Sequence, residues 1–119
     1  SMMLITHDLG VVARYADRIN VMYAGRIVER GTAEEIFHYP KHPYTLGLME
    51  SMPRLDQAPG SRLTPIPGQP PDLSDPPPGC PFHPRCRFAE ARCRSERPPL
   101  EQITDNHWKA CWVDTDAKR

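Results

Sequence analysis

The chain has 119 residues, 15 of them proline, and its 15 basic and 15 acidic side chains cancel to a net charge of zero. Because proline removes a backbone donor and fixes φ, a content far above the usual ~5% excludes regular structure over part of the chain. The balanced charge, without a basic cluster, argues against nucleic acid as a partner, and no apolar run approaches the ~20 residues of a membrane span.

The first residues predict a buried strand followed by a helix. Residues 3–6 form a short apolar run that ends in polar residues, as buried strands do. Asp8 then stands where a side chain can cap a helix. The apolar residues that follow have the spacing of one helix face and are Leu9, Val12, Ala13 and Ala16.

A β-hairpin is predicted next. Residues 18–23 alternate apolar and polar side chains, and residues 26–30 form a second short run with apolar residues between charges. Ala24-Gly25 lies between the two runs, and a glycine turn between short alternating runs is typical of a hairpin. We expect Gly31 to end the second strand.

Two helices are predicted after the hairpin. Thr32 and Glu35 have the spacing of a capping box, in which each side chain satisfies a backbone donor at a helix start, so a short helix is expected over 33–37. Pro43 suits the first turn of a second helix, which should run to about residue 52. The apolar residues that this helix presents to a neighbour are Leu46, Leu48 and Met49.

The prolines divide the rest of the chain. Nine of the 15 lie in residues 53–78, which we expect to form an extended linker. The residues from 79 onward contain all four cysteines and both tryptophans, and they are interpreted as a small, separate, irregular module. The predicted fold class is therefore α+β, with the regular elements in the first 52 residues.

The four cysteines are the strongest candidates for a metal site: Cys80, Cys86, Cys93 and Cys111. Few aliphatic residues surround them, and so thin a core rarely holds a domain together without a crosslink. Four thiolates suit zinc, although the intervals of five and six residues exceed the usual two to four. A 4Fe–4S cluster also takes four thiolates and accepts wider spacing. Disulfides or free buried thiols would also account for the four cysteines. His83 could replace a thiolate, but four cysteines complete a site, which favours an exposed or locally hydrogen-bonded His83.

His7 is the candidate ligand-binding residue near the start of the sequence. It follows the apolar run of residues 3–6 and precedes the predicted helix. Ligands of open α/β sheets bind at the carboxyl ends of strands, where such a side chain can reach them. A single histidine in this position is more often structural, so the position alone is a weak signal.

Several segments together carry a family resemblance: LITHDL at 4–9, ADRI at 16–19, VMYAGRIVE at 21–29, Gly31, HPYTLGL at 42–48, GCPFHPRC at 79–86, Cys93 and KAC at 109–111. The segments up to Gly31 resemble the switch-histidine strand and the following hairpin of ABC transporter ATPases. HPYT resembles the segment that follows the ATPase core in the peptide-importer subfamily, and the cysteine segments resemble its carboxyl-terminal region. The chain is thus identified as similar to the carboxyl-terminal part of the ATP-binding subunit of a dipeptide or oligopeptide importer, beginning at the switch-histidine strand.

The resemblance implies four parts and a role for His7. Residues 1–38 would be a truncated remnant of the α/β ATPase core, 39–52 a connector helix, 53–78 the linker and 79–119 the metal-binding module. His7 matches the switch histidine, which contacts the γ-phosphate of ATP and helps to position the attacking water. The family's Walker A, Walker B and signature motifs, which serve ATP and Mg²⁺, do not occur in this sequence. We therefore expect the chain alone to be inactive.

The resemblance also implies a cofactor and partners. The family's cysteine region is associated with a 4Fe–4S cluster, so Cys80, Cys86, Cys93 and Cys111 would be its ligands, with zinc as the alternative. The partners would be transmembrane permease subunits and a second ATP-binding subunit, at the cytoplasmic face of the membrane. An unpaired apolar strand at 3–6 is prone to association, so self-association through it is expected. A free-standing cysteine-rich interaction module that binds metal is the competing hypothesis.

Overall fold

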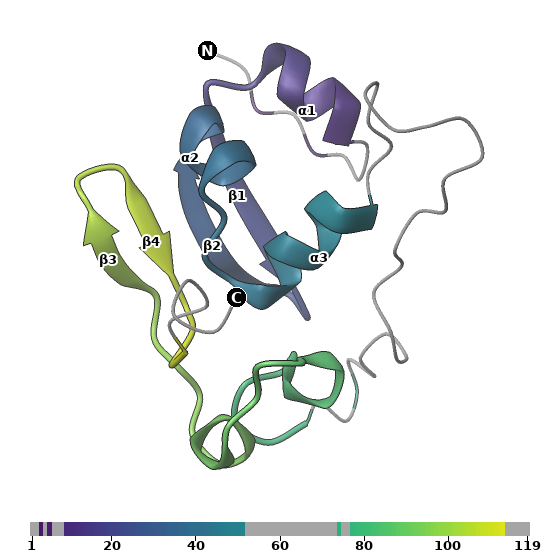
Figure 1. Ribbon diagram of the computed structural model, residues 1–119, viewed down its shortest axis with the longest axis vertical. Coiled ribbons are helices and arrows are strands. Elements are labelled where there is room, and N and C mark those ends of the chain that lie inside the picture. Colours follow the sequence, from purple (N-terminus) through teal and green to yellow (C-terminus); the bar gives the residue numbers. More distant parts are fainter. Residues whose placement is uncertain (1–2, 4, 6–8, 52–73, 75–76, 114–119) are drawn as a thin grey trace.

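The computed structural model describes residues 3, 5, 9–51, 74 and 77–113. The chain has a mixed α/β architecture built on an antiparallel four-stranded sheet with strand order β1-β2-β4-β3 (Figure 1). The strands are β1 (Arg18–Tyr23), β2 (Arg26–Thr32), β3 (Glu101–Thr104) and β4 (His107–Lys109). The helices are α1 (Leu9–Tyr15), α2 (Ala33–His38) and α3 (Pro43–Ser51), with short 3₁₀ turns η1 (His83–Arg85) and η2 (Ala91–Arg94).

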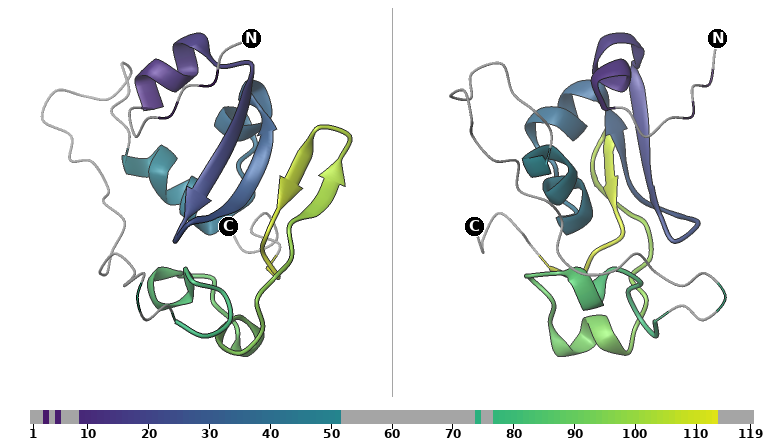
Figure 2. Two further views of the ribbon diagram at one scale, coloured as in Figure 1. Left: turned by 180° about the vertical axis from the view of Figure 1, so that it is seen from behind. Right: turned by 90° about the vertical axis from the view of Figure 1, so that its right-hand side faces the viewer.

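The helices and the cysteine segment take separate positions around this sheet. Helices α2 and α3 lie on the same side of the β1–β2 hairpin, and α1 lies near one end of it (Figure 2). The segment that contains η1 and η2 lies beyond the opposite end of the hairpin, below α3 in Figure 1. The segment with η1 and η2 is therefore next to α3 and distant from α1.

The β1–β2 hairpin confirms the prediction from the alternating runs. Ala24 and Gly25 form its turn with φ of 53° and 78°, the pair of positive values that two-residue hairpin turns require. Val21 and Tyr23 are buried on one face while Met22 is exposed on the other. The hairpin therefore follows from local sequence chemistry alone.

Strand β2 continues further than we expected. Gly31 lies inside the strand, where it is the register partner of Ile19 on β1 and of His107 on β4. A Cβ atom at Gly31 would stand 3.2 Å from the backbone oxygen of Asn106. This glycine thus permits close approach of β4 and does not terminate the strand, so the predicted end at Gly31 is wrong.

The two predicted helices are present. The Thr32 hydroxyl accepts a hydrogen bond from the Glu35 backbone N–H at 3.2 Å and caps α2. The Glu35 carboxylate contacts His107, a long-range partner that a capping box does not include. Helix α3 begins at Pro43, as expected, and buries the apolar side chains of Leu46 and Met49.

The carboxyl-terminal strands are not separate from the first part of the chain. Strand β4 pairs with β2 through Glu29 opposite Lys109 and Gly31 opposite His107, and β3 pairs with β4. The interpretation of residues 79 onward as a separate module is therefore wrong for residues 101–109. Strand β4 covers the edge of β2 that β1 leaves open. The paired segments are far apart in sequence, so local sequence patterns do not indicate this pairing.

Two other expectations fall largely outside the described residues. Of the predicted strand at 3–6, the structure describes Met3 and Ile5, which lie outside any strand and are 85% and 89% exposed. A strand needs a neighbour that accepts its backbone hydrogen bonds, and neither residue pairs with the described sheet. His7 and Asp8 lie outside the described residues, as does most of the proline-rich range 53–78.

An aromatic cluster joins the hairpin, α3 and the cysteine segment. The ring centroids of Tyr23 and Tyr44 are 4.7 Å apart, and Phe82 lies 5.1 Å from Tyr23 and 5.4 Å from Tyr44. Phe82 is only 3% exposed. The Arg85 guanidinium donates to the Tyr23 hydroxyl at 3.3 Å. This cluster fixes the first cysteine loop against the sheet.

Candidate tetracysteine metal site

All four cysteines line one small cavity between the cysteine segment and the start of α3. Cys80 and Cys93 are buried, while Cys86 and Cys111 are half-buried. All four lie within the described ranges, and no disulfide joins them. The other residues around the cavity include His42, Pro43, Phe82, His83, Pro98 and Trp112. The cysteine set predicted from sequence is thus brought together in space.

Gly79 brings the loops of Cys80 and Cys93 into contact. The Cys80 backbone N–H donates to the Cys93 carbonyl at 2.8 Å. Gly79 has φ of 71°, and a Cβ atom there would stand 2.5 Å from the same carbonyl oxygen. Real Cβ atoms do not approach backbone this closely, so a glycine is required for the two loops to meet.

The interval between Cys80 and Cys86 is wound into the turn η1. The Cys80 carbonyl accepts the His83 backbone N–H at 3.1 Å, and the Cys86 N–H donates to the His83 carbonyl at 3.2 Å. Nδ1 of His83 also lies 2.8 Å from the Cys80 carbonyl oxygen, which agrees with the local hydrogen bond expected for this histidine. Cys80 and Cys86 therefore flank a single 3₁₀ turn.

Backbone N–H groups face the sulfur of every cysteine. The Glu90 N–H lies 3.4 Å from Sγ of Cys93, and the Val113 N–H lies 3.4 Å from Sγ of Cys111. Backbone hydrogen bonds from Phe82 and His83 act on Cys80, and one from Phe88 acts on Cys86. Such donors favour the charged thiolate over the neutral thiol, and hydrogen bonds to sulfur are a regular feature of metal–thiolate centres.

The four thiols interact with one another electrostatically in all pairings. Burial raises the pKa of Cys86 and of Cys111 to about 11, and mutual repulsion between the cysteines adds to it. Burial also raises the pKa of Cys80. The nearby Lys109 ammonium acts in the opposite direction on the pKa of Cys111. Four thiols held together in this way need a cation to become four thiolates.

The residues suit a metal in their chemistry, and the cavity is small. Its volume is about 10 Å³, close to the space for one water molecule. Within the described ranges, no group of three or more His, Cys, Asp or Glu side chains is arranged to hold a metal ion. The thiols therefore share a cavity, with backbone donors in place, without standing at ligand positions.

Trp112 and Arg92 cover one side of the cysteine segment. The Arg92 guanidinium lies 3.5 Å from the centroid of the Trp112 ring, a cation–π arrangement. The indole N–H of Trp112 donates to the Glu96 carbonyl at 2.9 Å, and the Arg92 side chain pairs with the Glu96 carboxylate. These contacts hold the indole against the cavity that it lines.

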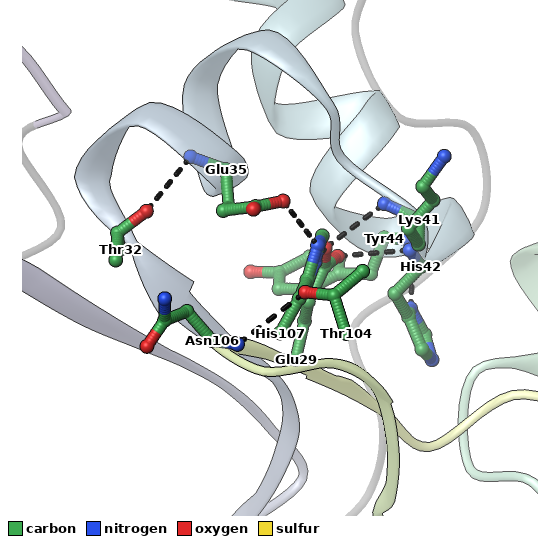
Figure 3. Close-up of polar contacts among 9 residues, drawn as sticks. All are labelled: Glu29, Thr32, Glu35, Lys41, His42, Tyr44, Thr104, Asn106 and His107. Atoms are coloured by element: carbon green, nitrogen blue, oxygen red, sulfur yellow. Dashed lines mark hydrogen bonds and ion pairs between the residues drawn. The ribbon is translucent and has the colours of Figure 1, made fainter.

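A buried polar network beside the cavity was missed by the sequence reasoning. The carboxylate of Glu29, fully buried in β2, accepts the backbone N–H of Lys41 at 2.9 Å and that of His42 at 2.8 Å (Figure 3). It also contacts Nε2 of the fully buried His107. Nδ1 of His107 lies 3.0 Å from the Glu35 carboxylate. Both ring nitrogens of His107 thus face carboxylates.

This network sets the position of the segment that precedes α3. Glu29 is in β2, Glu35 in α2 and His107 in β4, so three elements meet at one buried carboxylate–imidazole–carboxylate group. By accepting the two backbone N–H groups, Glu29 fixes where His42 enters the cavity wall. No local pattern marks Glu29 or His107 for this role, because their partners are distant in sequence.

None of the helices in the described part of the chain has the length and apolarity needed to cross a bilayer. His7, the other residue for which sequence indicated a function, lies outside the described residues. Its role as a phosphate-contacting histidine stays a prediction.

Comparison with known proteins supplies the family. The family described as "Oligopeptide/dipeptide transporter, C-terminal region" matches residues 28–93. The chain is 54% identical to the dipeptide transport ATP-binding protein DppD of Bacillus subtilis, over 95% of the chain and 33% of the relative. It is 50% identical to the oligopeptide transport ATP-binding protein OppD of the same organism, over 95% of the chain and 32% of the relative. It is 48% identical to OppD of Haemophilus influenzae, over 98% of the chain and 35% of the relative.

The chain belongs to the oligopeptide/dipeptide transporter C-terminal family. It matches the carboxyl-terminal region of peptide import ATP-binding proteins, which confirms the resemblance drawn from the sequence segments. The chain spans about a third of the length of these relatives.

Proposed function

We propose that this chain serves, within a complete protein, an ABC importer in which ATP hydrolysis energises the uptake of dipeptides or oligopeptides. The observation that supports this most directly is the family match, together with relatives named for dipeptide and oligopeptide transport. The complete protein would bind ATP and Mg²⁺, act with a second ATP-binding subunit and with permease subunits, and lie peripherally at the cytoplasmic face of the membrane. His7 would contact the γ-phosphate and help to position the attacking water.

Uptake measurements test this proposal. Cells that lack the complete gene should lose uptake of a labelled dipeptide or oligopeptide, and the wild-type gene should restore it. A gene with His7→Ala should restore little, because phosphoryl transfer depends on groups that position the attacking water. Unchanged uptake of both peptide classes after deletion would contradict the transport function.

The second candidate is a free-standing cysteine-rich interaction module that binds metal. The convergence of four thiols on one cavity favours metal binding under either hypothesis. The gene separates the two: an upstream coding region with a phosphate-binding P-loop supports the importer, whereas its absence supports the module.

We also propose that Cys80, Cys86, Cys93 and Cys111 hold a 4Fe–4S cluster with a structural role. The cluster would tie the loops of the cysteine segment to one another and to the residue after β4. Four thiols on one cavity, each with a backbone N–H donor at its sulfur, support this assignment. No redox function is assigned, because the surrounding residues are apolar or form local hydrogen bonds.

Zinc is the second candidate for this site, because four thiolates also suit a tetrahedral zinc ion. Anaerobic purification followed by iron, sulfide and zinc analysis distinguishes the cluster from zinc. Iron and sulfide at about four each per chain indicate the 4Fe–4S cluster, and stoichiometric zinc without iron overturns the cluster assignment.

Self-association is proposed as well. Met3 and Ile5 are apolar and largely exposed, and exposed apolar segments favour contact with a second copy. Light scattering should show concentration-dependent dimers, which Ile5→Lys should weaken. A strictly monomeric chain at high concentration would contradict this proposal.

A further inference from the structure

His42 has an unusual environment in the cavity wall. Its side chain is 1% exposed, and Nε2 has no hydrogen-bond partner among the described residues. The hydrogen bonds around the ring therefore decide where its proton lies.

The position of that proton follows from the other ring nitrogen. The Tyr44 backbone N–H donates to Nδ1 of His42 at 3.0 Å, so Nδ1 is an acceptor and the proton is on Nε2. Leaving a buried N–H without a hydrogen-bond partner is unfavourable. An orphaned donor of this kind indicates a partner that the polypeptide itself does not provide.

The His42 side chain lines the cavity of the four cysteines. Glu29 anchors the His42 backbone at 2.8 Å, and the imidazole extends away from the Glu29–His107 network (Figure 3). The ring centroid of Phe82 lies 5.9 Å away, and His42 lines the same cavity as the four cysteines.

Few acceptors other than sulfur are available in this cavity. The Trp112 indole N–H is a donor and is already engaged by Glu96, and Nδ1 of His83 is engaged by the Cys80 carbonyl. The Ala110 backbone is the alternative hydrogen-bond partner for the His42 ring, although no described atom stands in normal hydrogen-bond geometry to Nε2. The remaining polar atoms of the lining side chains are chiefly the four sulfurs.

The charge around the cavity fits an anionic group. Four thiolates around a divalent ion leave a net negative charge, and a cluster with four thiolates is also an anion. The Lys109 ammonium donates to the carbonyl of the cavity-lining Val113 at 2.9 Å, two residues from Cys111. A neutral N–H donor and a cation together would stabilise such a group.

We propose that His42 is a positioning residue that donates its Nε2–H hydrogen bond to a sulfur of the metal–thiolate group held by the four cysteines. This inference rests on the proposed metal site and assigns a role to the first residue of the HPYT segment. Through Glu29 and His107, the same residue links the metal group to β2 and β4. Metal loading would then stabilise the packing of the segment before α3.

Cadmium is a suitable probe, because it binds tetrathiolate sites and reports N–H···S contacts through scalar coupling in NMR spectra. The wild-type chain loaded with Cd²⁺ should show coupling between cadmium and the His42 Nε2–H proton. His42→Phe keeps a ring of similar size without the donor, so the coupling should vanish and the Cd²⁺ affinity should fall about 10–100-fold. His42→Gln, which returns an N–H near the same place, should recover part of the affinity.

Thr45→Val is the matched control. The Thr45 hydroxyl is also fully buried and has no hydrogen-bond partner among the described residues, but Thr45 does not line the cavity. This variant should keep both the coupling and the affinity. A Cd²⁺-loaded wild-type chain without the coupling, or His42→Phe with unchanged affinity, would overturn the role of His42. Failure of Cd²⁺ to bind the cysteines at all would overturn the metal site itself.

Discussion

Replacing Gly79 by alanine tests how the two halves of the cysteine segment meet. The added Cβ would stand 2.5 Å from the Cys93 carbonyl oxygen, 2.8 Å from the Arg94 carbonyl carbon and 2.8 Å from the Ser95 backbone nitrogen. All three atoms are backbone, so no side-chain rotation relieves the contact. The loops must separate, and the Cys80 to Cys93 hydrogen bond of 2.8 Å is lost.

The expected magnitude follows from two contributions. Alanine at a φ of 71° is strained by about 1–2 kcal/mol, and an overpacked contact adds about 1–3 kcal/mol. We therefore expect Gly79→Ala to lower the free energy of unfolding by about 3 kcal/mol. Because Cys80 and Cys93 move apart, bound metal should also be lost.

Gly25→Ala is the control that isolates the steric contribution. Gly25 has φ of 78°, and nothing lies within 4 Å of a Cβ atom there, so only the strain of about 1–2 kcal/mol applies. Denaturant titration followed by tryptophan fluorescence measures both variants. Equal losses of unfolding free energy, with metal retained by Gly79→Ala, would refute the close contact between the two loops.

The other predictions concern the metal ligands, the buried network and catalysis. Replacing any of the four cysteines by serine should abolish stoichiometric metal, whereas His83→Ala should retain it; metal analysis decides. Glu29→Gln should lower the free energy of unfolding by about 1–3 kcal/mol, because the amide NH₂ that replaces one carboxylate oxygen cannot accept a backbone N–H. The exposed Glu34→Gln should change it by less than about 0.5 kcal/mol; equal effects in denaturant titration would contradict the network. The purified chain should not hydrolyse ATP, and phosphate release above background would contradict its dependence on the rest of the protein.

The elements that sequence predicted well are those that local chemistry defines. A positive-φ turn at Ala24-Gly25 specifies the hairpin, the Thr32 cap starts α2, and Pro43 starts α3. Each signal involves neighbouring residues, so no knowledge of the remaining chain is needed.

The parts that sequence did not predict depend on long-range contacts. Glu29 and His107 are 78 residues apart, and nothing near either of them indicates the other. The pairing of β4 with β2 was missed for the same reason. It joins two parts of the chain that the proline-rich range 53–78 divides in the sequence. The cysteines were recognised as a set from their spacing, and they line one cavity in the structure.

Native mass spectrometry of the anaerobically purified chain tests the central claim most directly. If the four cysteines hold one metal group, the spectrum should show a single added mass, that of a 4Fe–4S cluster or of one zinc ion in the second assignment. That mass should disappear in Cys93→Ser and remain in Thr45→Val. A wild-type chain at its apo mass, or at a mass lowered by disulfide formation, would contradict the account.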